Sequence, residues 1–159
     1  MTKEVSVLLT KLRGEPCTRR EVGRGKSLSL GFGEEAEQTT IKRSRAYRLW
    51  EIGTLRSAWR ILKDGVLLCG SRDTDEPAEA NKTLAGIELG GFSSLRQLTE
   101  LDVRVELDNG VAIEFFTAFS DDDETFYISC PGKLWVKFSA REGWQTGPSD
   151  QPWSNVASA

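Results

Sequence analysis

The chain has 159 residues and a net charge of -3, with 38% hydrophobic and 28% charged residues, which is the composition of one ordinary globular domain. Its apolar runs are far shorter than the roughly 20 residues that span a bilayer, which excludes an integral membrane helix. It contains no histidine, which excludes a Ser-His-Asp or Cys-His catalytic set and a histidine-ligated metal.

The cysteines and the first residues bear on the compartment. Cys17, Cys69 and Cys130 are odd in number, widely spaced and without a C-x-x-C pair, so they predict neither a disulfide framework nor a zinc site. Charged residues are distributed along residues 1–13, unlike the apolar core of a secretory signal. We therefore expect a cytoplasmic protein with no cofactor and no metal.

Charge is divided unevenly along the chain. Residues 1–70 hold 14 Lys and Arg against 8 Asp and Glu, whereas residues 71–159 hold 7 against 16. The simpler interpretation is that two complementary faces attract each other within one fold. The alternative is an acidic surface that is offered to a basic partner.

The first predicted elements are a helix and a strand. Apolar residues recur at spacings of three and four in residues 1–13, which predicts a short helix that ends at Gly14. Residues 15–25 are interrupted by proline and glycine, and we expect no strand there. The first predicted strand alternates apolar and small residues over 26–32.

Three more strands are predicted before the middle of the chain. Residues 46–52 are rich in aromatic and branched side chains, which favour strands. Residues 57–62 and 66–70 flank Asp64-Gly65, a pair typical of a tight hairpin turn.

Two connecting segments follow. Residues 73–82 are polar and contain Pro77, so we expect a long loop between two halves of one fold. Phe92, Leu95 and Leu98 lie at three-residue spacing, which predicts a second short helix over residues 92–100 with Ser93 or Ser94 as its N-cap.

Residues 101–138 carry the clearest pattern. Apolar and charged residues alternate over 101–108, Asp108-Asn109-Gly110 is typical of a tight turn, and the chain returns over 111–115. The arrangement repeats in residues 125–130 and 133–138 around a Pro-Gly pair. We predict a meander of four antiparallel strands.

The elements together predict the α+β class, mainly antiparallel sheet with about seven strands in hairpins and a meander and with two short helices. The pattern leaves open whether the strands form one curved sheet or two packed sheets. Residues 1–144 are expected to form a single domain. Residues 145–159 are rich in Gly, Pro, Ser and Gln, and we expect a flexible C-terminal tail whose Trp153 can dock back onto the domain.

The candidate partner-binding site is the acidic run Asp121, Asp122, Asp123 and Glu124. Clustered carboxylates can bind Ca²⁺, but the run lacks the D-x-D-x-D-G spacing of a calcium loop. A solvated turn is the simpler interpretation, because acidic loop tips are common. Presenting charge to a basic partner requires less geometry than holding a metal.

No residue set matches a catalytic motif. Glu106 and Glu114 are expected to lie across a hairpin on its polar face, but nothing in the sequence raises the pKa of either carboxylate, as acid–base catalysis would require.

The sequence offers two further candidate surfaces. One is a basic run beside aromatic residues, formed by Lys42, Arg43, Arg45 and Arg48. Such a run can bind nucleic acid, but the acidic overall charge favours a solvated face. An exposed pair among the five tryptophans would indicate a binding surface; they are Trp50, Trp59, Trp135, Trp144 and Trp153.

One longer pattern supports a resemblance. The run Tyr-Arg-Leu-Trp-Glu-Ile at 47–52 is followed by Trp59-Arg60-Ile61, by Asp64-Gly65 and by Leu-Leu-Cys-Gly-Ser-Arg-Asp at 67–73. This pattern resembles small uncharacterised bacterial proteins found beside polymorphic toxins. Gly14-Glu15-Pro16-Cys17 to Phe32-Gly33 and the late strands ending in Trp144 extend the likeness over roughly residues 8–144. Residues 53–56 depart from the pattern as an insert.

That family has no established activity to carry onto any residue, and the resemblance implies an immunity or accessory role through genomic company alone. We therefore expect a non-enzymatic protein-binding module, an immunity protein that neutralises a cognate bacterial toxin. Its partner would be a basic toxin domain, with neither nucleic acid nor membrane among its partners. The alternative is a small-molecule-binding protein or a carboxylate-based enzyme with a pocket on the sheet, which an apolar pocket with converging Glu and Arg would favour.

Overall fold

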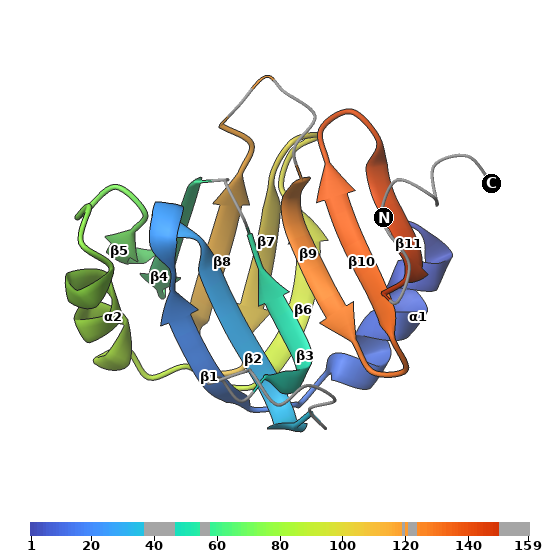
Figure 1. The fold of residues 1–159 in the computed structure, drawn as a ribbon, viewed down its shortest axis with the longest axis horizontal. Coiled ribbons are helices and arrows are strands. Elements are labelled where there is room, and N and C mark those ends of the chain that lie inside the picture. Colours follow the sequence, from blue (N-terminus) through green and yellow to red (C-terminus); the bar gives the residue numbers. More distant parts are fainter. Residues whose placement is uncertain (37–46, 55–57, 119, 121–123, 150–159) are drawn as a thin grey trace.

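The computed structural model describes residues 1–36, 47–54, 58–118, 120 and 124–149. They form two antiparallel sheets and two α-helices, which confirms the predicted α+β class with mainly antiparallel sheet. The strands therefore divide between two packed sheets, one lying in front of the other (Figure 1). The described residues contain 11 strands, more than the seven or so predicted.

The larger sheet has six strands and the smaller has five. The larger has the order β1 (Cys17–Val22), β2 (Leu28–Glu35), β3 (Arg48–Gly53), β9 (Glu124–Cys130), β10 (Leu134–Ser139) and β11 (Gly143–Pro148). The smaller has the order β5 (Val66–Gly70), β4 (Ala58–Lys63), β8 (Val111–Phe116), β7 (Val103–Leu107) and β6 (Phe92–Gln97). A short 3-10 turn, η1 (Arg24–Lys26), joins β1 to β2.

The inner faces of the two sheets share one hydrophobic core. The rings of Phe32 on β2 and Phe92 on β6 meet edge to face with centroids 6.1 Å apart. Phe115 on β8 and Phe126 on β9 do the same at 5.1 Å. All four side chains are buried, so the aromatic contacts hold one sheet against the other.

Each helix covers one open side of this sandwich (Figure 1). α1 (Lys3–Leu12) buries Val5, Leu9 and Leu12 beside β6, and Thr2 caps it by accepting a hydrogen bond from the Val5 N–H at 3.3 Å. The predicted first helix is thus confirmed, and it ends before Gly14, whose φ of +87° is readily adopted by glycine. α2 (Pro77–Ala85) packs beside the edge strand β1 and buries Leu84.

The prediction that residues 15–25 contain no strand is wrong, because β1 lies there. The charged residues of β1 conceal the alternation that is typical of a strand. Arg19 and Glu21 lie on the outer face of the sheet, whereas Val22 lies on the opposite face and is buried.

The predicted loop at 73–82 is also wrong, since α2 begins within it. Pro77 is the first residue of that helix, a position where the missing N–H costs nothing.

The predicted helix at 92–100 is instead strand β6. A register shift between Phe92 and Ser94 places Phe92 and Leu95 on the same buried face despite their three-residue spacing.

The three tight hairpins predicted around Asp64-Gly65, Asp108-Asn109-Gly110 and Pro131-Gly132 are confirmed as β4–β5, β7–β8 and β9–β10. The continuous four-strand meander is wrong, because β7–β8 belongs to the smaller sheet and β9–β10 to the larger. The segment predicted as a tail is corrected for residues 145–148, which belong to β11. Residues 150–159 lie outside the described residues.

Candidate functional site

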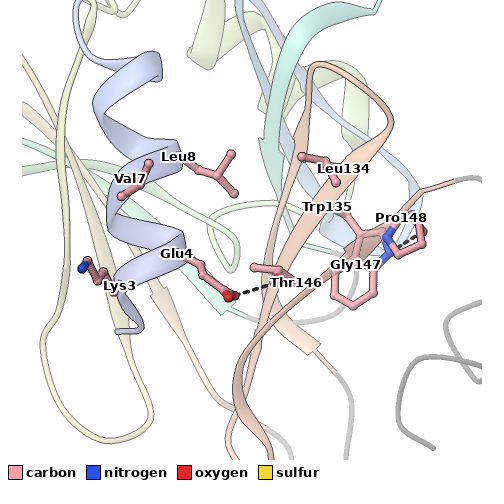
Figure 2. A pocket seen from close by; sticks show the side chains of 9 residues that line it. All are labelled: Lys3, Glu4, Val7, Leu8, Leu134, Trp135, Thr146, Gly147 and Pro148. Atoms are coloured by element: carbon pink, nitrogen blue, oxygen red, sulfur yellow. Dashed lines mark hydrogen bonds between the residues drawn. The ribbon is translucent and has the colours of Figure 1, made fainter. Parts of the chain in front are cut away.

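A groove of about 630 Å³ lies between α1 and the β10–β11 hairpin (Figure 2). We call it the α1 groove. Nine residues from α1, the first described element, and from β10 and β11, the last two, line it: Lys3, Glu4, Val7, Leu8, Leu134, Trp135, Thr146, Gly147 and Pro148.

The helical wall exists because α1 has two apolar faces. One face is anchored in the core, as described above. Val7 and Leu8 lie one turn beyond Lys3 and Glu4 and line the groove (Figure 2). Val7 is 52% exposed, so packing of the core does not require an apolar side chain at that position.

The opposite wall is built on a cross-strand pair. Trp135 of β10 and Gly147 of β11 face each other in register, and a Cβ on Gly147 would lie 2.5 Å from Cζ2 of Trp135. The glycine is therefore required for the indole to lie over β11. The indole N–H of Trp135 donates to the carbonyl oxygen of Pro148 at 2.9 Å, which fixes the ring, and Leu134 beside it is 39% exposed.

The groove has little polar chemistry of its own. Lys3 and Glu4 are the charged members of its lining, and the Thr146 hydroxyl donates to the Glu4 carboxylate at 3.4 Å across the gap (Figure 2). A polar ligand needs several convergent donors or acceptors, which this lining does not supply. The arrangement instead suits an apolar side chain with one charged group near the rim.

The predicted carboxylate pair lies on the outer face of the smaller sheet. Glu114 is 6% exposed at its side chain and lies 2.5 Å from Arg60 Nε and 2.8 Å from Arg104 Nη1. Glu106 is 35% exposed and pairs with Arg104 at 3.1 Å and with Arg96 at 3.4 Å. Glu114 is thus held by guanidinium groups on both neighbouring strands, and Glu106 is held by one on its own strand and one on β6. These ion pairs stabilise the sheet surface.

A second ion-pair cluster occupies the outer face of the larger sheet. Glu51 is buried, and its Oε2 lies 3.0 Å from Arg19 Nη1 and accepts a hydrogen bond from the Ser29 hydroxyl at 3.1 Å. Its other oxygen accepts the backbone N–H of Arg48 at 2.8 Å. Arg48 also pairs with Glu35 at 3.8 Å, whereas Lys42, Arg43 and Arg45 of the same basic run lie outside the described residues.

The structure describes one of the four residues of the acidic run. Asp121, Asp122 and Asp123 lie outside the described residues, and Glu124 is the first residue of β9. Among the described residues, β8 belongs to the smaller sheet and β9, which begins at Glu124, to the larger. The role of the acidic run as a partner-binding site stays a prediction.

Three of the four tryptophans that the structure describes are buried. Trp50, Trp59 and Trp135 are at most 5% exposed. Trp144 is half-buried against the rings of Phe126 and Phe138, so the four described tryptophans form no exposed pair. Trp153 lies outside the described residues.

Burial also makes the three thiols poor nucleophiles. It raises the pKa of Cys17 and of Cys69 to about 11 and that of Cys130 to about 12, so all three stay protonated at neutral pH.

Within the described ranges, no three Cys, Asp or Glu side chains form a group that could hold a metal ion. The helices in those ranges are too short and too polar to cross a membrane.

The described residues thus define a two-sheet α+β domain with an apolar groove on one open side. No family model, curated protein or solved structure matches the chain. Sequence reasoning missed the groove because its walls come from distant segments. The available signals were Val7, which lies off the buried helix face, and Leu134, which is apolar immediately after a turn.

Proposed function

We propose that the chain is a non-enzymatic protein-binding module whose α1 groove receives an apolar segment of its partner. The observation that carries this proposal is the exposure of Val7 and Leu134 on facing walls of a groove of about 630 Å³. Apolar side chains on a concave surface gain free energy when a partner removes them from water. Such grooves commonly hold a short segment of another protein by a few anchor side chains.

The alternative of a carboxylate-based enzyme has less support. It requires an apolar pocket into which Glu and Arg converge, whereas the α1 groove offers Glu4 and Lys3 alone. The buried carboxylates Glu51 and Glu114 lie elsewhere, on the outer faces of the sheets, and each is engaged by arginine. Binding of an apolar partner segment in the α1 groove is therefore the function that the geometry favours.

As to the partner, we propose a toxin encoded beside this chain, which the chain would neutralise as an immunity protein. The resemblance described above and the acidic second half of the chain support this proposal. Carboxylates of the acidic run would attract a basic toxin domain during the encounter, because long-range charge steers association. The groove would then supply the contact that persists in the complex.

The test uses single substitutions at exposed positions, so that the fold is preserved. Val7→Asp and Leu134→Asp should each raise the Kd for the protein encoded next to this gene by about tenfold or more, because a carboxylate in the groove must be desolvated without a partner. Val66→Asp is the matched control, since Val66 is 64% exposed on β5, far from the groove. Equal affinities for the Val7 and Val66 variants would contradict the proposal, and circular dichroism verifies that each variant is folded.

A further inference from the structure

The part of the chain that the structure describes ends at the rim of the α1 groove. Pro148, the last residue of β11, lines the groove, and the backbone N–H of Ser149 donates to the carbonyl of Lys133 at 2.6 Å. The backbone is therefore held against β10 up to Ser149, beside exposed Leu134. Residues 150–159 begin directly after this point.

We infer that the occupant of the α1 groove in the isolated protein is the chain's own segment 150–159, with Trp153 as the anchor. Trp153 is the single aromatic residue in that segment, and it follows Pro148 by five positions. Because the backbone is held up to Ser149, the tether to Trp153 is four residues, which span at most about 14 Å when extended. The helical wall from Lys3 to Leu8 is only about 8 Å long along the axis, so the indole reaches every part of it.

The chemistry of the segment matches that of the groove. An indole buries about 150–250 Å² of mostly apolar surface, and Val7, Leu8 and Leu134 present apolar walls to receive it. A tether this short supplies an effective concentration in the millimolar range, so weak intrinsic docking is enough to fill the groove.

This contact would regulate the proposed site, because a partner segment must displace Trp153 before it binds. The regulatory role rests on the proposed function of the groove, whereas the docking of Trp153 does not. The two ideas therefore make separate predictions, one for the isolated chain and one for the complex.

Docking is tested on the full chain labelled with 5-fluorotryptophan. Trp153→Phe removes one fluorine signal and so assigns it to Trp153. In the parent chain this signal should be displaced from that of free 5-fluorotryptophan and should change little between H₂O and D₂O. Leu134→Asp should move it to the free position, while the control Val66→Asp leaves it in place. A Trp153 signal at the free position in the parent chain, or one that Leu134→Asp and Val7→Asp both leave unmoved, would overturn the inference.

The regulatory role is tested with the neighbouring gene product as the probe. Trp153→Ala in the full chain should lower its Kd severalfold, because the competing indole is gone. An unchanged Kd, with the fluorine result intact, would mean that Trp153 docks but that the partner does not use the groove. If Val7→Asp weakens the partner while the fluorine result is negative, the proposed function stands and this inference fails.

Discussion

The side chain of Asn81 on α2 pairs with both backbone groups of Val22 on β1: Oδ1 accepts the Val22 N–H at 2.9 Å, and Nδ2 donates to the Val22 carbonyl at 2.8 Å. β1 is the edge of the larger sheet, and Val22 is buried there, so these groups depend on Asn81 for partners. An amide side chain thus takes the place of a neighbouring strand.

Replacing Asn81 by Ala should therefore lower the free energy of unfolding by about 2 kcal/mol, because a donor and an acceptor at a buried position are left unpaired. Urea unfolding measures the loss, and hydrogen exchange at the Val22 amide should accelerate. Lys82→Ala, at an exposed position on the same helix, serves as control. If both variants lose the same stability, Asn81 has no such role.

A second prediction concerns Glu114, which is buried between Arg60 and Arg104. Glu114→Ala should destabilise the fold by about 2–3 kcal/mol, because two guanidinium groups lose this buried carboxylate and the partly buried Arg104 retains Glu106 as a more distant partner. Glu106→Ala should cost less than about 1 kcal/mol, since Glu106 is 35% exposed and water screens its ion pairs. Chemical unfolding of both variants compares them, and a larger loss for Glu106→Ala would contradict the ranking.

The buried thiol of Cys130 predicts how stability depends on pH. Its pKa in the folded protein is about 12, above the ordinary value of about 9 that applies to the unfolded chain. The unfolded chain therefore loses this proton first as the pH rises, and the contribution to stability falls from about pH 9 upward. Between pH 8 and pH 10, the parent protein should lose about 1 kcal/mol more stability than Cys130→Ala. Parallel pH profiles of the two proteins in urea unfolding would refute this.

The acidic run supports a prediction about rates. Replacing Asp121, Asp122, Asp123 and Glu124 by Asn, Asn, Asn and Gln should slow association with a basic partner and flatten its salt dependence, while the fold is retained. Stopped-flow mixing with the neighbouring gene product at low and high salt provides the measurement. Unchanged rates would remove the acidic run from the binding model without affecting the α1 groove.

Local patterns were sufficient to predict much of the fold. The alternation of Val103, Val105 and Leu107 with polar residues predicts β7, because side chains of a strand point to opposite faces. Turn residues such as Asn109 and Gly110 predict the hairpin that follows, since their backbone preferences are local. Elements whose evidence lies within a few residues are therefore recoverable from sequence.

Tertiary structure decided which strands share a sheet and which polar segments form strands. β9 joins the larger sheet by pairing with β3, as in the register of Gly53 with Tyr127, a contact that no local pattern encodes. The charged strand β1 forms because its neighbour β2 and the Asn81 amide satisfy its backbone. A polar segment becomes a strand when partners distant in sequence supply its hydrogen bonds.

The α1 groove is the clearest case of a feature that only the tertiary structure creates. Val7 and Leu134 lie near opposite ends of the described chain. In the sequence alone, Val7 is one apolar residue in the middle of a helix and Leu134 is one at the start of a strand. Their exposure and their facing positions arise because α1 covers the open side of the sandwich next to β11. Sequence determines the apolar character of each wall, but a cavity between walls exists only when long-range packing sets their separation.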